Sequence, residues 1–209
     1  MKIGVIGGTG SFGVAMATRL VEAGYEVIIG SRDAERAKAT AAEVGAAGGA
    51  TNADAARTAD LVVLATNADA ALETAKGLAD AIGTTPVLSV AAELEFGKGG
   101  VRPTPEATSI AQRIQDVVAG PVVAGLHSLA AANLGGEEAP EEDTLVCGDD
   151  AEAKAMVLEV AGRLTSGRAV DAGPLASARA LEGLTAVIIN VNKRYKTHAG
   201  VRVTGLDGH

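Results

Sequence analysis

Residues 1–13 read Met-Lys-Ile-Gly-Val-Ile-Gly-Gly-Thr-Gly-Ser-Phe-Gly, and this stretch decides the fold. Its first half, residues 2–7, is a short apolar run typical of a buried β-strand. Gly8, Gly10 and Gly13 then fit the pattern G-x-G-x-x-G, and a helix-like segment follows directly. A strand, a glycine turn and a helix in this order predict a βα unit that binds the phosphates of a nucleotide.

The glycines have a physical purpose at this turn. A tight turn needs backbone angles that only glycine adopts at low cost. The middle glycine, Gly10, lets the backbone approach a pyrophosphate, and Gly13 lets the helix pack closely on the strand. Amides at the helix start, with the positive end of the helix dipole, then hold the phosphates. The alternative is a glycine turn without a ligand, but the complete strand–turn–helix context favours nucleotide binding.

The end of the second predicted strand, at residues 30–33, indicates which nucleotide is bound. In NAD binders an acidic residue about 20 positions past the glycines takes the ribose hydroxyls. Here the sequence is Gly-Ser-Arg-Asp, and Ser31 and Arg32 suit a 2′-phosphate, with Arg36 adding charge one turn later. We therefore predict NADP rather than NAD. The alternative is that Asp33 takes the ribose or caps the next helix while Arg32 is only solvated.

Strands and helices alternate along the rest of the chain. We expect strands at 25–30, 61–66, 86–91, 121–126, 144–148 and 168–171, and helices at 14–23, 33–44, 52–58, 70–82, 108–118, 151–164 and 175–196. This alternation predicts the α/β class, with a Rossmann-type, doubly wound, mostly parallel sheet. Thr66 and Asn67 follow a buried strand, at the sheet edge where such folds bind ligands, unless Asn67 or Asp69 only caps the next helix.

The remaining segments are predicted to be connections. Residues 45–50 are expected to form a small-residue loop, and residues 93–105, rich in glycine and proline, a lid or a surface connection. The acidic residues 135–143 are expected to form a solvated loop rather than a metal site, because they lack an alternating ligand pattern. The tail, residues 200–209, is expected to be ordered only by a partner.

The last helix carries an apolar stripe, which predicts a core-facing side. The stripe consists of Leu181, Leu184, Ile188, Val191 and Tyr195. Val187 and Ile189 widen the apolar surface, which favours a second burial partner and hence a homodimer through this C-terminal helix.

Composition limits the partners and the compartment. The chain has 209 residues, a formal net charge of −8, no Trp, and two residues each of Phe and Tyr, which argues against nucleic acid as a partner. Cys147 is the only cysteine, so an intrachain disulfide is excluded, in keeping with a reducing cytoplasm. No apolar run reaches the length of a membrane span, and a core strand begins at residue 2, so we expect a cytoplasmic protein without a signal peptide.

Several stretches together resemble one family, the reductases that pass hydride between NADP and the deazaflavin coenzyme F-420 (F420). The resemblance covers nearly the whole chain in the family's order, and its Cys-Gly-Asp-Asp and Asp-Ala-Gly-Pro-Leu segments are the most specific. The resembling segments are residues 7–13, 30–32, 125–127, 146–150, 171–175 and 182–185.

The resemblance implies an NADP-binding Rossmann domain at residues 1–142 and a small C-terminal α/β domain at residues 143–209 that covers the deazaflavin cleft. It also implies a role for individual residues. For NADP these are Gly8, Thr9, Gly10, Ser11, Phe12 and Gly13 at the phosphate turn, Ser31, Arg32 and Arg36 at the 2′-phosphate, and Val90 and Ala131 on the nicotinamide side. For the deazaflavin they are His127, Arg179 and Thr185.

The implied chemistry is direct hydride transfer between NADP(H) and F420, which needs neither a catalytic side chain nor a metal. His127 is the one side chain that we expect to tune charge on the deazaflavin; otherwise it is a structural histidine at a strand end. Arg179 contacts the deazaflavin or is a surface residue, and Cys147 is expected in the core. Two other functions stay open: NADPH-dependent reduction of a flavin, quinone or imine, and a nucleotide-binding sensor without turnover.

Overall fold

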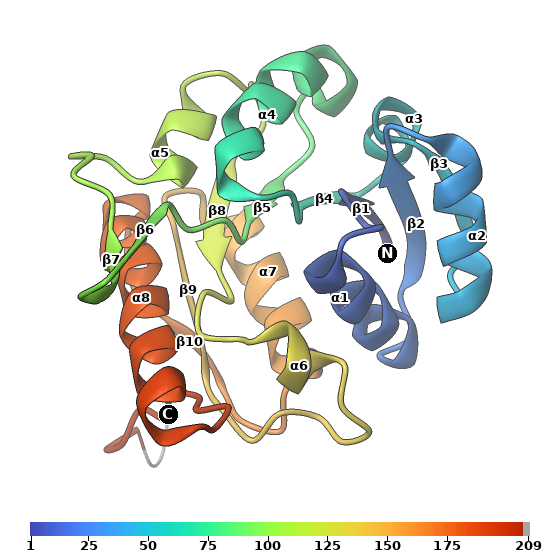
Figure 1. The fold of residues 1–209 in the computed structure, drawn as a ribbon. Helices are drawn as coiled ribbons and strands as arrows, with labels where there is room; N and C mark the ends of the chain where they lie inside the picture. The colour runs from blue at the N-terminus through green and yellow to red at the C-terminus, as the bar shows by residue number, and fades with distance from the viewer. Residues whose placement is uncertain (207–209) are drawn as a thin grey trace.

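The computed structural model describes residues 1–206 as one α/β layer structure (Figure 1). Its strands are β1 (Lys2–Ile6), β2 (Glu26–Ser31), β3 (Gly48–Thr51), β4 (Leu61–Leu64), β5 (Val87–Ser89), β6 (Leu94–Gly97), β7 (Gly100–Pro103), β8 (Val122–Gly125), β9 (Thr144–Gly148) and β10 (Ala169–Asp171). Its helices are α1 (Ser11–Glu22), α2 (Ala34–Val44), α3 (Asn52–Arg57), α4 (Ala68–Ile82), α5 (Ile110–Gln115), α6 (Ala131–Leu134), α7 (Ala151–Leu164) and α8 (Ala178–Tyr195), with a 3₁₀ turn, η1 (Leu175–Ser177), before α8.

The main sheet has the order β10-β9-β8-β5-β4-β1-β2-β3. β1, β2, β3, β4, β5 and β8 are parallel, β9 is antiparallel to β8, and β10 is parallel to β9. The predicted Rossmann-type, mostly parallel sheet is therefore confirmed. Chain order reverses between β1 and β4, and such a switch point opens a crevice at the carboxyl ends of the strands. The predicted boundary between the two domains, at residue 142, lies between β8 and β9, which pair in the same sheet.

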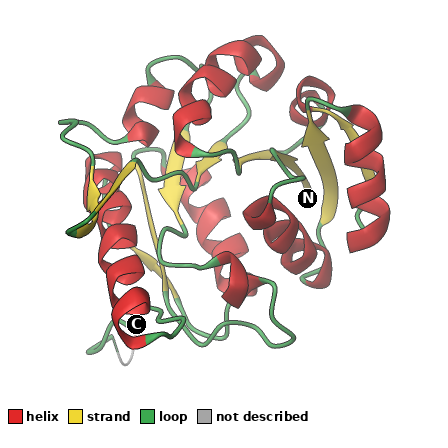
Figure 2. Ribbon diagram, in the orientation of Figure 1, coloured by secondary structure: helices red, strands yellow, loops and turns green. Residues whose placement is uncertain are grey.

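Helices cover both faces of the sheet (Figure 2). α1, α2 and α7 share one apolar cluster with the sheet, with α6 beside α1, whereas α3, α4, α5 and α8 contribute to the other cluster. Every residue of β4 is buried, which explains its continuous apolar sequence, because a central parallel strand faces helices on both sides. In α1, Met16 and Leu20 are completely buried at a helical spacing of four residues. Each such side chain stabilises the fold by about 1.5–3 kcal/mol.

Residues 45–50 are not simply a loop, because Gly48–Thr51 form β3. A Cβ on Gly49 would lie 2.2 Å from the carbonyl carbon of Ala37 in α2, so glycine is required for this helix to pack on the strand. Residues 93–105 likewise differ from the expected loop. They form an antiparallel hairpin, β6–β7, in which Gly97 pairs with Gly100.

The acidic segment before β9 differs from the predicted solvated loop, because Glu142 and Asp143 are each only 2% exposed. Asp143 accepts hydrogen bonds from the Arg168 guanidinium at 2.9 Å and from the backbone N–H of Val203 at 2.8 Å. These hydrogen bonds, those of Arg168 first, hold the pKa of the Asp143 carboxyl well below its usual range. Buried carboxylates need such partners, and here the C-terminal tail supplies one of them.

The tail and the last helix also differ in part from expectation. The backbone N–H of Asp143 donates to the carbonyl of Val201 at 2.7 Å, and the N–H of Val203 donates to the Asp143 carboxylate, so the tail is bound to its own chain as far as residue 203. Residues 207–209, included in the prediction for the tail, lie outside the described residues. In α8, Leu181 and Ile188 are buried, but Tyr195, expected in the core-facing stripe, is 70% exposed, and Val187 is 57% exposed.

Candidate cofactor-binding site

The glycine turn after β1 has the geometry that phosphate binding requires. Gly7 has φ +75°, and the N–H of Gly10 donates to the Gly7 carbonyl at 3.1 Å, which closes the turn. A Cβ on Gly13 would lie 2.6 Å from the Gly7 oxygen, so glycine there lets α1 approach the turn. A Cβ on Gly10 would meet only that oxygen, at 3.5 Å. The space in front of Gly10 is thus open to a ligand.

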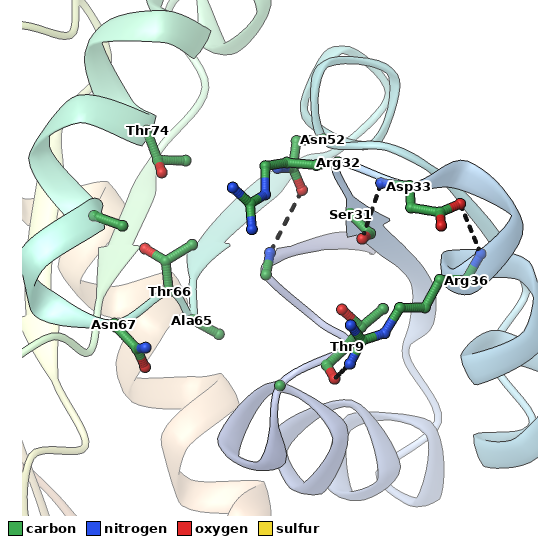
Figure 3. A pocket seen from close by; sticks show the side chains of 13 residues that line it. Thr9, Ser31, Arg32, Asp33, Arg36, Asn52, Ala65, Thr66, Asn67 and Thr74 are labelled. Atoms are coloured by element: carbon green, nitrogen blue, oxygen red, sulfur yellow. Dashed lines mark hydrogen bonds between the residues drawn. The ribbon is translucent and has the colours of Figure 1, made fainter.

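A cavity of about 480 Å³ opens beside this turn, at the switch point between β1 and β4 (Figure 3). Seven of the predicted NADP residues line it: Thr9, Gly10, Ser31, Arg32, Arg36, Thr66 and Asn67. Gly7, Asp33, Asn52, Ala65, Ala70 and Thr74 complete the lining. We call this space the first cavity. The structure does not bring Gly8, Ser11 or Gly13 to its surface; the N–H of Gly8 donates to Gly30 at 3.0 Å beneath the turn.

Positive charge gathers where β2 ends. Asp33 caps α2, because its carboxylate accepts the N–H groups of Glu35 at 3.0 Å and Arg36 at 3.2 Å. The Arg36 guanidinium donates to the carbonyl of Thr9 at 3.2 Å and so lies against the phosphate turn, while Arg32 is exposed to the cavity (Figure 3). Two guanidinium groups beside a hydroxyl favour an anionic ligand group such as a phosphate.

A second cavity, of about 210 Å³, adjoins the first, and the two share Ala65, Thr66 and Asn67. Besides Thr66 and Asn67, four further predicted residues line this second cavity: Phe12, Val90, His127 and Thr185. Its other residues are Ala68, Ala91, Ala92, Leu94, Leu126 and Leu129. The structure thus brings together residues from α1, α8 and the segments after β4, β5 and β8. Most of its lining residues are apolar, as in sites that take ring systems.

His127 is held in a defined state in the second cavity. Its side chain is buried, and Nε2 lies 3.2 Å from the carbonyl oxygen of Ala91, so this nitrogen carries the hydrogen. Nδ1 is buried and has no hydrogen-bond partner in the described part of the chain. Burial lowers the pKa of His127 to about 4. The imidazole is therefore neutral near pH 7 and offers a free acceptor.

The backbone around His127 is also fixed. The Thr185 hydroxyl donates to the His127 carbonyl at 2.9 Å, which ties α8 to the end of β8. Leu126, directly before it, has φ 65°, a left-handed conformation that costs a non-glycine residue about 1–3 kcal/mol. Such local strain is found mainly where surrounding contacts hold a functional segment in place.

Besides Gly8, Ser11 and Gly13, two more predicted residues, Arg179 and Ala131, line neither cavity. Arg179 donates to the carbonyls of Glu106, at 3.1 Å, and Thr104, so it holds the chain between β7 and α5. Ala131 begins α6 and lines neither space.

Cys147 is buried in β9, and burial raises the pKa of its thiol to about 11, which makes it a poor nucleophile.

Sequence reasoning missed four lining residues of the first cavity, Asn52, Ala65, Ala70 and Thr74, and the six apolar residues that complete the lining of the second. Asn52 follows β3, and the glycine-rich sequence of that strand hid its position at the sheet edge. Ala70 and Thr74 lie one turn apart on α4, where no motif marks them.

The residues present fit a dinucleotide and a second ring system. The open turn at Gly10 and the cations at Arg32 and Arg36 match phosphates, and the buried Nδ1 of His127 and the buried, unpartnered hydroxyl of Thr66 await polar ligand atoms. Within residues 1–206, no group of three or more His, Cys, Asp or Glu could hold a metal ion, and no helix is long and apolar enough to cross a membrane.

A mostly parallel sheet with a phosphate turn and a cationic crevice at its switch point defines a dinucleotide-binding protein of the Rossmann class. The family model described as "NADP oxidoreductase coenzyme F420-dependent" matches residues 2–93. The F420-dependent NADP reductase of Methanocaldococcus jannaschii is 34% identical and aligns over 99% of this chain and 100% of its own length. The chain therefore belongs to the family of F420-dependent NADP reductases.

Two further comparisons agree with this membership. The F420-dependent NADP reductase of Methanothermobacter thermautotrophicus is 36% identical over 99% of this chain and 96% of its own length. A crystal structure from an Arthrobacter species, described as a candidate F420-dependent NADP reductase, is similar with a TM-score of 0.86 and 27% identity. It covers 98% of this chain and 100% of that one.

Proposed function

We propose that this chain transfers a hydride reversibly between NADP(H) in the first cavity and F420 in the second. One observation carries this proposal: the two cavities adjoin at Ala65, Thr66 and Asn67, so ligands in them would meet at the end of β4. The first has the phosphate turn and the cations, and the second has an apolar lining with a buried acceptor, Nδ1 of His127.

The two coenzymes supply the hydride chemistry, and the protein supplies binding, orientation and exclusion of water. Thr9, Gly10 and the start of α1 would hold the pyrophosphate, and Ser31, Arg32 and Arg36 the 2′-phosphate. Phe12 and Val90 would pack on the ring side of the second cavity. His127 would accept a hydrogen bond there and stay neutral, while Thr185 holds its backbone.

The test is an NADPH oxidation assay run beside bleaching of oxidised F420. Stoichiometric loss of both absorbance bands is the expected result. If NADPH binds but F420 stays oxidised, the placement in the second cavity fails, and a screen of flavin, quinone and imine acceptors decides between another reductase and a sensor. If NADPH does not bind, the placement in the first cavity fails as well.

We further propose a cytoplasmic homodimer in which residues 143–209 form the smaller unit beside the deazaflavin and α8 contacts the partner copy. Support for the contact comes from Phe96 on β6 and from Val187 and Tyr195 on α8, which are 69%, 57% and 70% exposed. Large apolar side chains that are exposed in the single chain favour an interaction surface. Light scattering on the purified chain should give twice the chain mass, and Val187→Glu should halve it.

A further inference from the structure

Asn52 in the first cavity has no role in the assignments above. It is the first residue of α3, directly after β3, and it lines the cavity beside Ser31 and Arg32 (Figure 3). We propose that the Nδ2 amide of Asn52 donates a hydrogen bond to the adenosine ribose of NADP(H) at its 2′-phosphate, and so contributes to the preference for NADPH over NADH. This role depends on the proposed placement of NADP(H) in the first cavity.

The most ordinary role of an asparagine at a helix start is to cap the helix, and here another residue does that. Thr51 is the N-cap of α3, and its hydroxyl accepts the N–H of Asp54 at 3.2 Å and donates to the Asp54 carboxylate at 2.7 Å. The side chain of Asn52 is thus not needed by its own helix, and it points to the cavity side of the sheet edge (Figure 3).

The orientation of the Asn52 amide follows from its contact with the phosphate turn. The backbone N–H of Gly7 donates to Oδ1 of Asn52 at 3.5 Å, and only the oxygen of an amide can accept this hydrogen. Nδ2 therefore points away from Gly7. Within residues 1–206 it donates to no protein atom, although the side chain lines the cavity. Two N–H donors are left for a ligand.

Asn52 lies where the phosphate turn and the end of β2 meet. The N–H of Gly8 donates to Gly30 at 3.0 Å and joins these two segments. A Cβ on Gly30 would approach Oδ1 of Asn52 to 3.0 Å, so the absence of a side chain at Gly30 makes room for it. Ser31 and Arg32, the predicted 2′-phosphate residues, follow directly.

The donor character of Nδ2 is what makes it selective. An ionised 2′-phosphate has only acceptor oxygens, which a neutral donor beside the Arg32 guanidinium complements. The ribose hydroxyl of NADH can be either donor or acceptor, so an acceptor at position 52 would serve NADH and repel the phosphate. The residue at this position therefore acts on the difference between the two nucleotides.

Asn52→Asp tests this role, because a carboxylate has the same shape and still accepts the N–H of Gly7 while it replaces the donor by an acceptor. Calorimetric titration should show NADPH and 2′,5′-ADP binding weakened about tenfold or more, with NADH changed less than about threefold. The thermal midpoint of the free chain reports whether the turn is intact. An NADPH affinity within about twofold of wild type, with an unchanged midpoint, overturns the role of Asn52.

Two further variants keep the result interpretable. Asp54→Asn changes the charge of α3 by one unit outside the cavity and should alter NADPH affinity less than about twofold. A change in affinity as large as that of Asn52→Asp would mean that general charge, not contact, is responsible.

Asn52→Ala removes the donor without adding charge and should weaken NADPH binding more than NADH binding, whereas equal losses contradict selectivity. If the wild-type chain binds NADPH no better than NADH, there is no preference for Asn52 to support and its role is overturned; if it does not bind NADPH at all, the proposed placement itself fails.

Discussion

The two adjoining cavities are built in different ways. The first is built around a glycine turn and the end of β2, so seven of its lining residues lie within the first 36 residues, and α3, α4 and the segment after β4 complete it. The second is assembled from side chains of α1, α8 and three strand ends, and Thr185 and His127 join parts of the chain 58 residues apart. A site built of local backbone leaves a motif in the sequence, whereas a site built from distant side chains does not.

The largest effect is expected at the backbone of the first cavity. In Gly13→Ala the new methyl would lie 2.6 Å from the Gly7 oxygen and 2.7 Å from Gly8 Cα, and backbone atoms cannot move aside cheaply. We expect a loss of about 1–3 kcal/mol of stability and of NADPH binding by about a hundredfold or more, seen by denaturation and calorimetry.

Gly10→Ala is the matched control for that prediction. Its methyl would meet only the Gly7 oxygen, at 3.5 Å, so the fold should keep its thermal midpoint while NADPH binding weakens. Wild-type stability and affinity in Gly13→Ala would show that α1 can shift and that the turn is not limited by packing.

The next effect is expected at the cationic end of the same cavity. Arg32→Ala should weaken NADPH about 10- to 100-fold and NADH far less, because one charge-assisted contact to the 2′-phosphate is lost. Arg57→Ala, on an exposed arginine paired with Asp54 outside the cavity, is the control in the same titrations. Equal losses for both nucleotides in Arg32→Ala would refute a 2′-phosphate role.

A smaller effect, confined to the other coenzyme, is expected in the second cavity. His127→Ala should leave NADPH affinity within about twofold and slow the deazaflavin half-reaction about tenfold, the size of one buried hydrogen bond. Because its pKa lies near 4 rather than 6.5, His127 should add no step to the rate profile between pH 5.5 and 8. Intact turnover in the variant would remove this residue from the site.

The smallest effect on coenzyme affinity is expected at Glu182, a buried residue of α8 that lines neither cavity, where the change is one of stability. Glu182 is completely buried and accepts the N–H groups of Ile110 at 2.8 Å and Ala111 at 3.3 Å. Burial raises its pKa from 4.5 to about 7, so the folded chain binds the proton more tightly than the unfolded chain. This group therefore costs nothing below pH 4.5, and its cost grows as the pH rises to 7.

Glu182→Gln removes this titration but keeps an acceptor for both amides. Between pH 5 and 8 the wild-type chain should lose about 2–3 kcal/mol of unfolding free energy relative to the variant, measured by urea denaturation. Arg179, 3.9 Å away, and Glu93 are the other charged groups that bear on this carboxyl. Parallel pH profiles of the two proteins would contradict the assignment.

What could be predicted from the sequence follows the same division between local and distant structure. The apolar runs of β1 and β4 and the phosphate turn were predicted nearly to the residue, because their signals lie within a few positions. β3 was missed, since Gly48–Thr51 has little strand propensity and is held by packing against Ala37. The β6–β7 hairpin was missed because its glycines are typical of loops. Its pairing is supported by α8, where the Asn190 side chain accepts the N–H of Val101 and donates to the Val101 carbonyl.

Side-chain burial was the least predictable property. Asp143 belongs to an acidic run that is typical of a solvated loop. Hydrogen bonds from Arg168 and from the tail, both distant in sequence, offset the cost of burying its charge. For Arg179 the resemblance implies a deazaflavin contact, with a surface position as the alternative, and its guanidinium donates to carbonyls of the segment before α5.

The burial of Cys147 has a practical consequence for following this protein by fluorescence. Its thiol is enclosed in β9 and has a pKa near 11, so it stays protonated and out of reach of maleimide reagents at neutral pH. The native chain thus needs no cysteine removed before labelling. A single dye attached through Lys98→Cys, at the exposed turn of the hairpin whose first residue, Leu94, lines the second cavity, would report the arrival of a deazaflavin on an otherwise unmodified protein.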